Sequence, residues 1–268
     1  MGGFHVSINF ITDKVNVKVK GRVATIEMNR PESLNAMDSE MIRGLVCKLK
    51  EISESDEIDI VVLTGKGRSF SAGGDIKTML SNMNENDFYP VMDSISELIV
   101  TLYSMPKLTI SAITGAAAGL GFSLALATDH IIAEKNSKLA MNFIGIGLIP
   151  DGGAHFFLEK KLGETKAKQV IWDGKMMDAD EAFALGLIEE VAEANLQETL
   201  EARISDWLSR PVQAMIKTKK ILADMHRPYL LKILELEKYS QQKMRETIDH
   251  QEGIKAFIEK RPPRFIGK

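Results

Sequence analysis

Residues 110–129 read ISAITGAAAGLGFSLALATD, and this stretch decides the fold of the chain. A short apolar run ends at Gly115, small residues and glycines follow, and helical apolar spacing resumes from Gly121. This order predicts a strand, a tight turn and the start of a helix. Backbone N–H groups are free at such a helix start, where they stabilise an anion or an oxygen that becomes negative during a reaction.

The segments on either side of this stretch predict an α/β fold. Alternating or continuous apolar residues predict strands at 15–19, 23–28, 58–63, 108–113 and 130–133. Helical spacing predicts a helix after Asp38, which is placed to cap it, and another from Pro90 to Pro106. Beyond residue 154 the pattern is helical, over 156–162, 165–172, 178–185, 196–208 and 212–260. Such an order is typical of an α/β core with a helical C-terminal region.

Composition excludes several classes of partner and site. With 268 residues, 44% of them hydrophobic, the chain is long enough to bury a large core. A net charge of -3 gives no electrostatic reason to expect nucleic acid or an anionic membrane as partner. The single cysteine, Cys47, excludes internal disulfides, and we expect it to be packed rather than reactive. No apolar run reaches the roughly 18 residues of a membrane span, so a cytoplasmic location is expected.

Three loops are candidates for a site, at 65–77, 115–123 and 143–153. The first two are rich in glycine and follow apolar runs, so each could direct backbone N–H groups into one cavity. A dinucleotide fingerprint fails in the first loop, and no phosphate-binding Gly-Lys-Ser/Thr motif occurs. Residues 77–89 are polar and predict either a solvated loop or a functional lid.

Five ordered motifs make the assignment more specific. They are NRP at 29–31 with NAM at 35–37, SFSAGGDIK at 69–77, the stretch from 115 to 129, GLIPDGG at 147–153 and EGIKAFIEKR at 252–261. Together they resemble the crotonase (enoyl-CoA hydratase/isomerase) superfamily. This resemblance implies a spiral ββα core over residues 1–200 and a helical region over 201–268 used for trimerisation. It also implies an acyl-CoA thioester substrate, no cofactor beyond that coenzyme A, and a homotrimer or dimer of trimers.

The resemblance also implies roles for particular residues. The backbone N–H groups of Gly74 and Leu120 match the pair that holds the thioester oxygen as it becomes an enolate, although Leu120 replaces the usual glycine. Family positions for binding the substrate and its coenzyme A correspond to Ala72, Gly73, Asp75, Ile76, Phe143, Phe257 and Lys260.

Two departures from the family pattern bear on the reaction. Hydratases of the family use two glutamates, and the matching positions here are Ser123 and Phe143, which provide no carboxylate. Asp151, after Pro150, occupies the position where some isomerases of the family place their catalytic acid. One carboxylate suffices to move a proton between two carbons, so an enoyl-CoA isomerase is favoured. Asp151 is also placed to cap a helix that begins near Gly152.

Several alternatives remain open from sequence. One is an enoyl-CoA hydratase of fatty-acid or related acyl-CoA breakdown, and another is an acyl-CoA-binding homologue without activity. A hydrolase with Ser123 as nucleophile is a weaker option, because the second glycine of a nucleophile elbow is absent. His155 is expected to be packed rather than catalytic. The acyl chain length is undetermined, with Phe143, Met79, Phe122 and residues 82–89 as candidate pocket residues.

Overall fold

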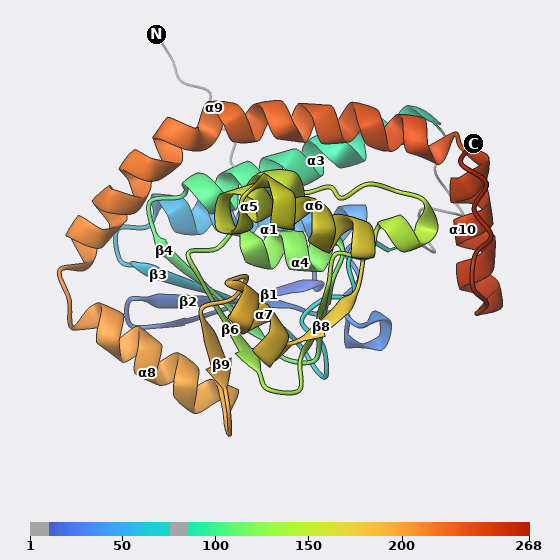
Figure 1. Ribbon diagram of the computed structural model, residues 1–268. Helices are drawn as coiled ribbons and strands as arrows, with labels where there is room; N and C mark the ends of the chain where they lie inside the picture. Colours follow the sequence, from blue (N-terminus) through green and yellow to red (C-terminus); the bar gives the residue numbers. More distant parts are fainter. Residues whose placement is uncertain (1–10, 76–84) are drawn as a thin grey trace, which may run out of the picture.

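The computed structural model describes residues 11–75 and 85–268, and within them the predicted strands form one sheet (Figure 1). Its order is β1-β2-β3-β4-β6-β9, where β1 and β2 form an antiparallel hairpin and the other neighbours are parallel. The strands are β1 (Val15–Lys20), β2 (Val23–Met28), β3 (Ile60–Gly65), β4 (Leu108–Ile113), β6 (His130–Glu134) and β9 (Glu190–Ala192). A smaller sheet joins β5 (Ala116–Ala118), β7 (Lys138–Ala140) and β8 (Met176–Asp178).

The continuous apolar runs of the central strands are explained by burial on both faces of the main sheet. In β3, Val61 and Leu63 belong to the large core packed by α1 (Ser39–Glu54) and α3 (Glu85–Ser104). Ile60 and Val62 belong to a second core that includes residues of α8 (Leu196–Leu208) and the start of α9 (Val212–Arg245). Parallel strands covered on both faces read as unbroken hydrophobic segments.

The architecture is the predicted crotonase-like spiral. Successive turns add a strand of the main sheet, a short strand of the second sheet and a helix, as in β4–β5–α4 and β6–β7–α5. The other helices of the described residues are α4 (Leu120–Leu126), α5 (Ala154–Leu162), α6 (Glu164–Asp173), α7 (Ala179–Leu185), α10 (Ile248–Glu259), η1 (Pro31–Ser33) and η2 (Ile144–Ile146). Figure 1 shows α9 running across one side of the molecule, over α3 and α5. Helix α8 crosses position 200, where the sequence suggested the core ends.

Three local predictions were wrong. The helix expected over 212–260 is two helices, because Thr247 lies in extended backbone and its side chain caps α10 by accepting from the His250 N–H. Helix α3 begins at Glu85, so Pro90 lies inside it rather than at its start. Residues 116–118, expected to turn, form β5. The cap predicted at Asp38 is confirmed, and Asp178 caps α7 within a capping box.

Among the described residues, no helix combines the length and apolar character needed to cross a membrane. The predicted binding residue Ile76, the pocket candidate Met79 and the polar connection as far as residue 84 lie outside the described residues.

Candidate active site

Two glycine-rich loops meet at the edge of the second sheet, and glycine at position 73 lets them approach closely. The Ser71 N–H donates to the Ala116 carbonyl and the Ala118 N–H donates to the Ser71 carbonyl, both at 3.0 Å. Gly73 has a φ of +100°, and a Cβ there would lie 2.7 Å from the Ala118 carbonyl oxygen and 3.4 Å from the Leu120 nitrogen. Only glycine combines that backbone angle with such a contact.

This contact brings together the two amides predicted to stabilise an enolate oxygen. Leu120 is the first residue of α4, so its N–H has no partner within the helix. Gly74 lies beside Met37, whose backbone bonds Gly73 and Asp75 instead. Within residues 11–75 and 85–268, neither the Gly74 nor the Leu120 N–H has a hydrogen-bond acceptor. Both residues line one cavity of about 870 Å³.

Asp151 lines the same cavity, and its carboxyl group is largely removed from water. The residue is 9% exposed, and its Oδ1 has no hydrogen-bond partner in the described part of the chain. Burial, with a smaller contribution from the charge of Glu237, raises the pKa of Asp151 to about 7, against a lowering contribution from the Gln241 amide. A carboxyl group with a pKa near neutral pH can both accept and return a proton.

Asp151 does not cap α5, as one reading of the sequence suggested. The N-cap of α5 is Gly153, which has no side chain to bond the N–H groups of the first turn. The carboxylate of Glu237, from α9, takes this role by accepting from the Gly153 N–H at 2.7 Å and the His155 N–H at 3.2 Å. His155 is thereby held by its backbone and also by its Nδ1, 2.7 Å from the same carboxylate.

Glu237 and Gln241 were missed by the sequence analysis, although a signal was present. Charged and amide side chains on a long helix normally face solvent, so neither residue stood out. Yet both continue the spacing of the buried residues Leu230 and Leu234, at intervals of four, three and four. Glu237 is 2% exposed and Gln241 is 3% exposed. Polar residues on an apolar stripe were therefore the available indication of a buried polar site.

The two positions that match the hydratase glutamates have other roles. Ser123 is fully buried, and its hydroxyl donates to the Asp151 carbonyl at 2.8 Å. It is absent from the cavity lining, so its hydroxyl fixes the loop that carries Asp151. Phe143 lines the cavity, and its ring would be 3.6 Å from a Cβ at Gly119.

Most residues predicted to bind substrate surround the same cavity. Its lining includes Ala72, Gly73, Asp75, Phe143 and Phe257. Asp75 forms an ion pair with Arg30 at 3.0 Å, which holds the loop at 65–75 in place. Lys260 is not among the lining residues: it ends α10 with a φ of +54°.

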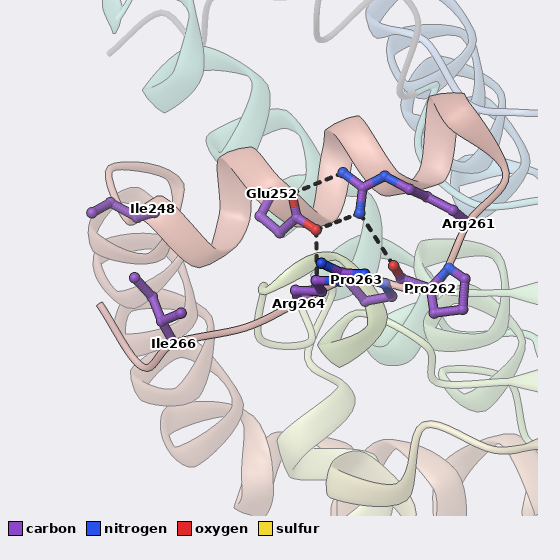
Figure 2. Close-up of a pocket in the computed structure, with 7 residues that line it drawn as sticks. All are labelled: Ile248, Glu252, Arg261, Pro262, Pro263, Arg264 and Ile266. Atoms are coloured by element: carbon purple, nitrogen blue, oxygen red, sulfur yellow. Dashed lines mark hydrogen bonds and ion pairs between the residues drawn. The ribbon is translucent and has the colours of Figure 1, made fainter.

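The C-terminal segment forms one wall of the cavity through Phe257, Arg261 and Pro263. Figure 2 shows how this segment folds back along α10, with Glu252 as its anchor. The Glu252 carboxylate accepts from the Arg261 guanidinium at 2.5 and 2.9 Å and from the Arg264 N–H at 2.9 Å. These bonds lower the pKa of Glu252 to about 2, so the anchor stays charged at neutral pH.

Comparison with known proteins agrees with this geometry. The sequence profile of the family described as enoyl-CoA hydratase/isomerase matches residues 18–268. The chain belongs to the enoyl-CoA hydratase/isomerase family, within the crotonase superfamily. Its relatives in that family include the Bacillus subtilis protein YhaR, 47% identical over 94% of this chain and 98% of YhaR. The 1,2-epoxyphenylacetyl-CoA isomerase of Escherichia coli strain K12 is 33% identical, over 93% of this chain and 97% of the isomerase.

Solved structures of the family share this fold. An enoyl-CoA hydratase from Mycobacterium avium subsp. paratuberculosis K-10 superimposes with a TM-score of 0.85, at 29% identity, over 94% of this chain and 98% of that one. Family membership makes this chain an acyl-CoA enzyme of the hydratase/isomerase type.

Proposed function

We propose that this protein is an enoyl-CoA isomerase in which Asp151 moves one proton between two carbons of the acyl chain. The observation that carries the proposal is the position of one buried carboxyl group, with its pKa raised to about 7, in the cavity that the Gly74 and Leu120 amides also line. The positions that match the two hydratase glutamates hold Ser123 and Phe143, so neither of them supplies a carboxylate. Relatives are named both as isomerases and as hydratases, so the choice rests on the residues of the site.

The proposed reaction balances with one acid/base group. The Asp151 carboxylate takes a proton from C2 of a 3-enoyl thioester, and the electron pair moves into the thioester carbonyl to give a dienolate. The two amides stabilise the oxygen that becomes negative; one such donor is worth roughly 10²–10³ in rate. The carboxyl group then returns the proton to C4, and the double bond ends between C2 and C3. No water is added, so no second carboxylate is required.

The test compares wild-type protein with Asp151→Asn on two substrates. With 3-enoyl-CoA, formation of the conjugated thioester is followed by absorbance, and the variant is expected to lose about 10²–10⁴ in kcat. Binding of a saturated acyl-CoA, measured by calorimetry, should change little, since Asn keeps the shape of the side chain. Isomerase turnover undiminished in the variant would exclude Asp151 from the mechanism.

The second substrate separates the alternatives. Hydration of 2-enoyl-CoA removes the conjugated absorbance, and wild-type protein is expected to do this far more slowly than it isomerises 3-enoyl-CoA. Faster hydration than isomerisation would instead make the protein a hydratase. Binding of acyl-CoA without turnover of either substrate would make it a binding protein.

A further inference from the structure

Helix α9 presents two buried polar side chains to the loop that carries Asp151. Its buried stripe is apolar through Leu230 and Leu234 and then continues with Glu237 and Gln241. These two residues are four apart, so they lie one turn apart on the same face. A buried carboxylate and a buried amide are retained at such positions only when they have partners.

The partners of both side chains lie within seven consecutive residues. Gln241 Nε2 donates to the Ile149 carbonyl at 2.8 Å and to Asp151 Oδ2 at 3.2 Å. Glu237 accepts the Gly153 N–H and is bonded to the backbone and ring of His155. The two side chains thus hydrogen-bond to the chain on both sides of Asp151, and Gln241 also bonds the carboxyl group of Asp151 directly.

The two residues act on Asp151 in opposite electrostatic directions. The negative charge of Glu237 disfavours a second negative charge nearby and so favours the protonated carboxyl group of Asp151. The Gln241 N–H donor favours the ionised carboxylate. A group that must both accept and release a proton in one turnover needs such a balance.

We propose that Glu237 and Gln241 are positioning residues of the isomerase reaction, which hold Asp151 from a buried face of α9 and keep it able to take and return a proton. This inference rests on the proposed function, in which Asp151 is the acid/base. Gln241 orients the carboxyl group by bonding Oδ2, which leaves Oδ1 as the oxygen without a partner in the described chain. Glu237 supplies the fixed charge and the cap of α5.

Other titratable groups lie in the cavity lining or beside Glu237 and must be counted in any pH profile. His155, from α5, is bonded to Glu237 rather than to Asp151. Burial lowers the pKa of His250, from α10, which favours its neutral form near pH 7. Among the described residues, the titratable ones that line the cavity besides Asp151 are Asp38, Arg43, Asp75, Arg245, His250 and Arg261. The variants described next leave all of these unchanged.

The test is the pH profile of kcat/KM for 3-enoyl-CoA in two variants that remove opposite influences. In Glu237→Gln the charge is lost and the shape is kept, so the rising limb is expected to move to lower pH by about 0.5–1 unit. In Gln241→Met the donor is lost, so the limb is expected to move to higher pH, with kcat about tenfold lower and KM little changed. A merely structural role would not shift the two limbs in opposite directions.

A matched control is Glu235→Gln, which makes the same chemical change on the exposed face of α9. It is expected to leave the profile unchanged. The proposal would be overturned if the rising limb of kcat/KM in both variants lay within 0.2 pH units of the wild type (about 0.3 kcal/mol). It would also be overturned if both limbs shifted in the same direction. If Glu237→Gln does not fold, the Gln241→Met profile decides: an upward shift supports the proposal and an unchanged limb overturns it.

The Asp151→Asn variant shows whether a negative result concerns the proposed function or only the role of Glu237 and Gln241. If that variant keeps wild-type turnover, the proposed function fails and the role of the pair fails with it. If that variant is inactive while the limbs of the other two variants do not move, the proposed function stands and only the role of Glu237 and Gln241 is lost.

Discussion

The carboxyl group of Asp151 is stabilised in its neutral form by the fold, and this links its chemistry to the stability of the protein. Its folded-state pKa, about 7, lies well above the ordinary value of an aspartate, 3.8. Between these values the folded protein binds more protons than the unfolded chain. The contribution of Asp151 to stability is therefore fully present below pH 3.8 and is lost as the pH rises through 7.

Asp151→Asn should consequently be more stabilising at high pH than at low pH. Relative to the wild type, the free energy of unfolding of the variant is expected to rise by about 2–4 kcal/mol between pH 4 and pH 8, because the variant has no buried carboxylate to ionise. Denaturant unfolding of both proteins at these two pH values measures the difference. The same difference at both pH values would mean that Asp151 titrates normally in the folded state.

Gly73 controls the distance between the two loops that carry the amides. In Gly73→Ala, the added Cβ would lie 2.7 Å from the Ala118 carbonyl oxygen at a φ of +100°, so the loops must separate. We expect kcat to fall by about 10² or more through the displaced amides, together with a loss of about 1–3 kcal/mol in stability. Steady-state kinetics and thermal unfolding measure the two effects.

The control for this variant is Gly21→Ala in the β1–β2 turn. Gly21 also has a positive φ, +58°, but a Cβ there meets nothing within 4 Å. It should lose about 1 kcal/mol in stability and keep its activity. Equal losses of activity in both variants would show that backbone strain anywhere in the fold, rather than loop separation, reduces turnover.

Helix α4 and the loop before α5 are joined by the Ser123 hydroxyl, which donates to the Asp151 carbonyl. In Ser123→Ala that buried carbonyl loses this donor, so we expect a loss of about 1–2 kcal/mol in stability and a decrease in kcat of no more than about tenfold. Thermal unfolding and isomerase assays test this. A complete loss of turnover in a folded variant, with thioester hydrolysis in the wild type, would instead support the nucleophile alternative.

The sequence predicted the central strands because burial on both faces leaves a continuous apolar signal, as in residues 60–63. It did not predict β5, because three alanines carry neither strand nor helix periodicity and their strand forms through pairing with β7 and with Ser71. Among site residues, the loops around Gly74, Leu120 and Asp151 were found through family motifs. The spacing of buried residues on α9 could have indicated that Glu237 is buried, but its partners lie more than 80 residues away, and local pattern does not reveal which segments pack together.

On the whole molecule, exposed apolar side chains of α9 lie on the side away from the core. Ile221 and Met225, one turn apart, are 69% and 64% exposed. Because the family resemblance implies trimers, we expect this face to contact other copies of the chain. Sedimentation velocity should give a trimer or hexamer for the wild type and smaller species for Met225→Glu. The exposed control Lys232→Glu should keep the wild-type mass, and a monomeric wild type would contradict the expectation.

The burial of Asp151 also predicts how the residue at this position should differ among homologues of different activity. Selection for stability alone would replace Asp151 by an uncharged residue, since its ionisation above pH 7 opposes folding. An acid retained at this position therefore indicates continued selection for proton transfer. Among homologues, those that keep an acid here with a glutamate and a glutamine four residues apart on the facing helix are expected to be isomerases. Homologues with asparagine or an apolar residue at this position are expected to bind acyl-CoA without moving its double bond.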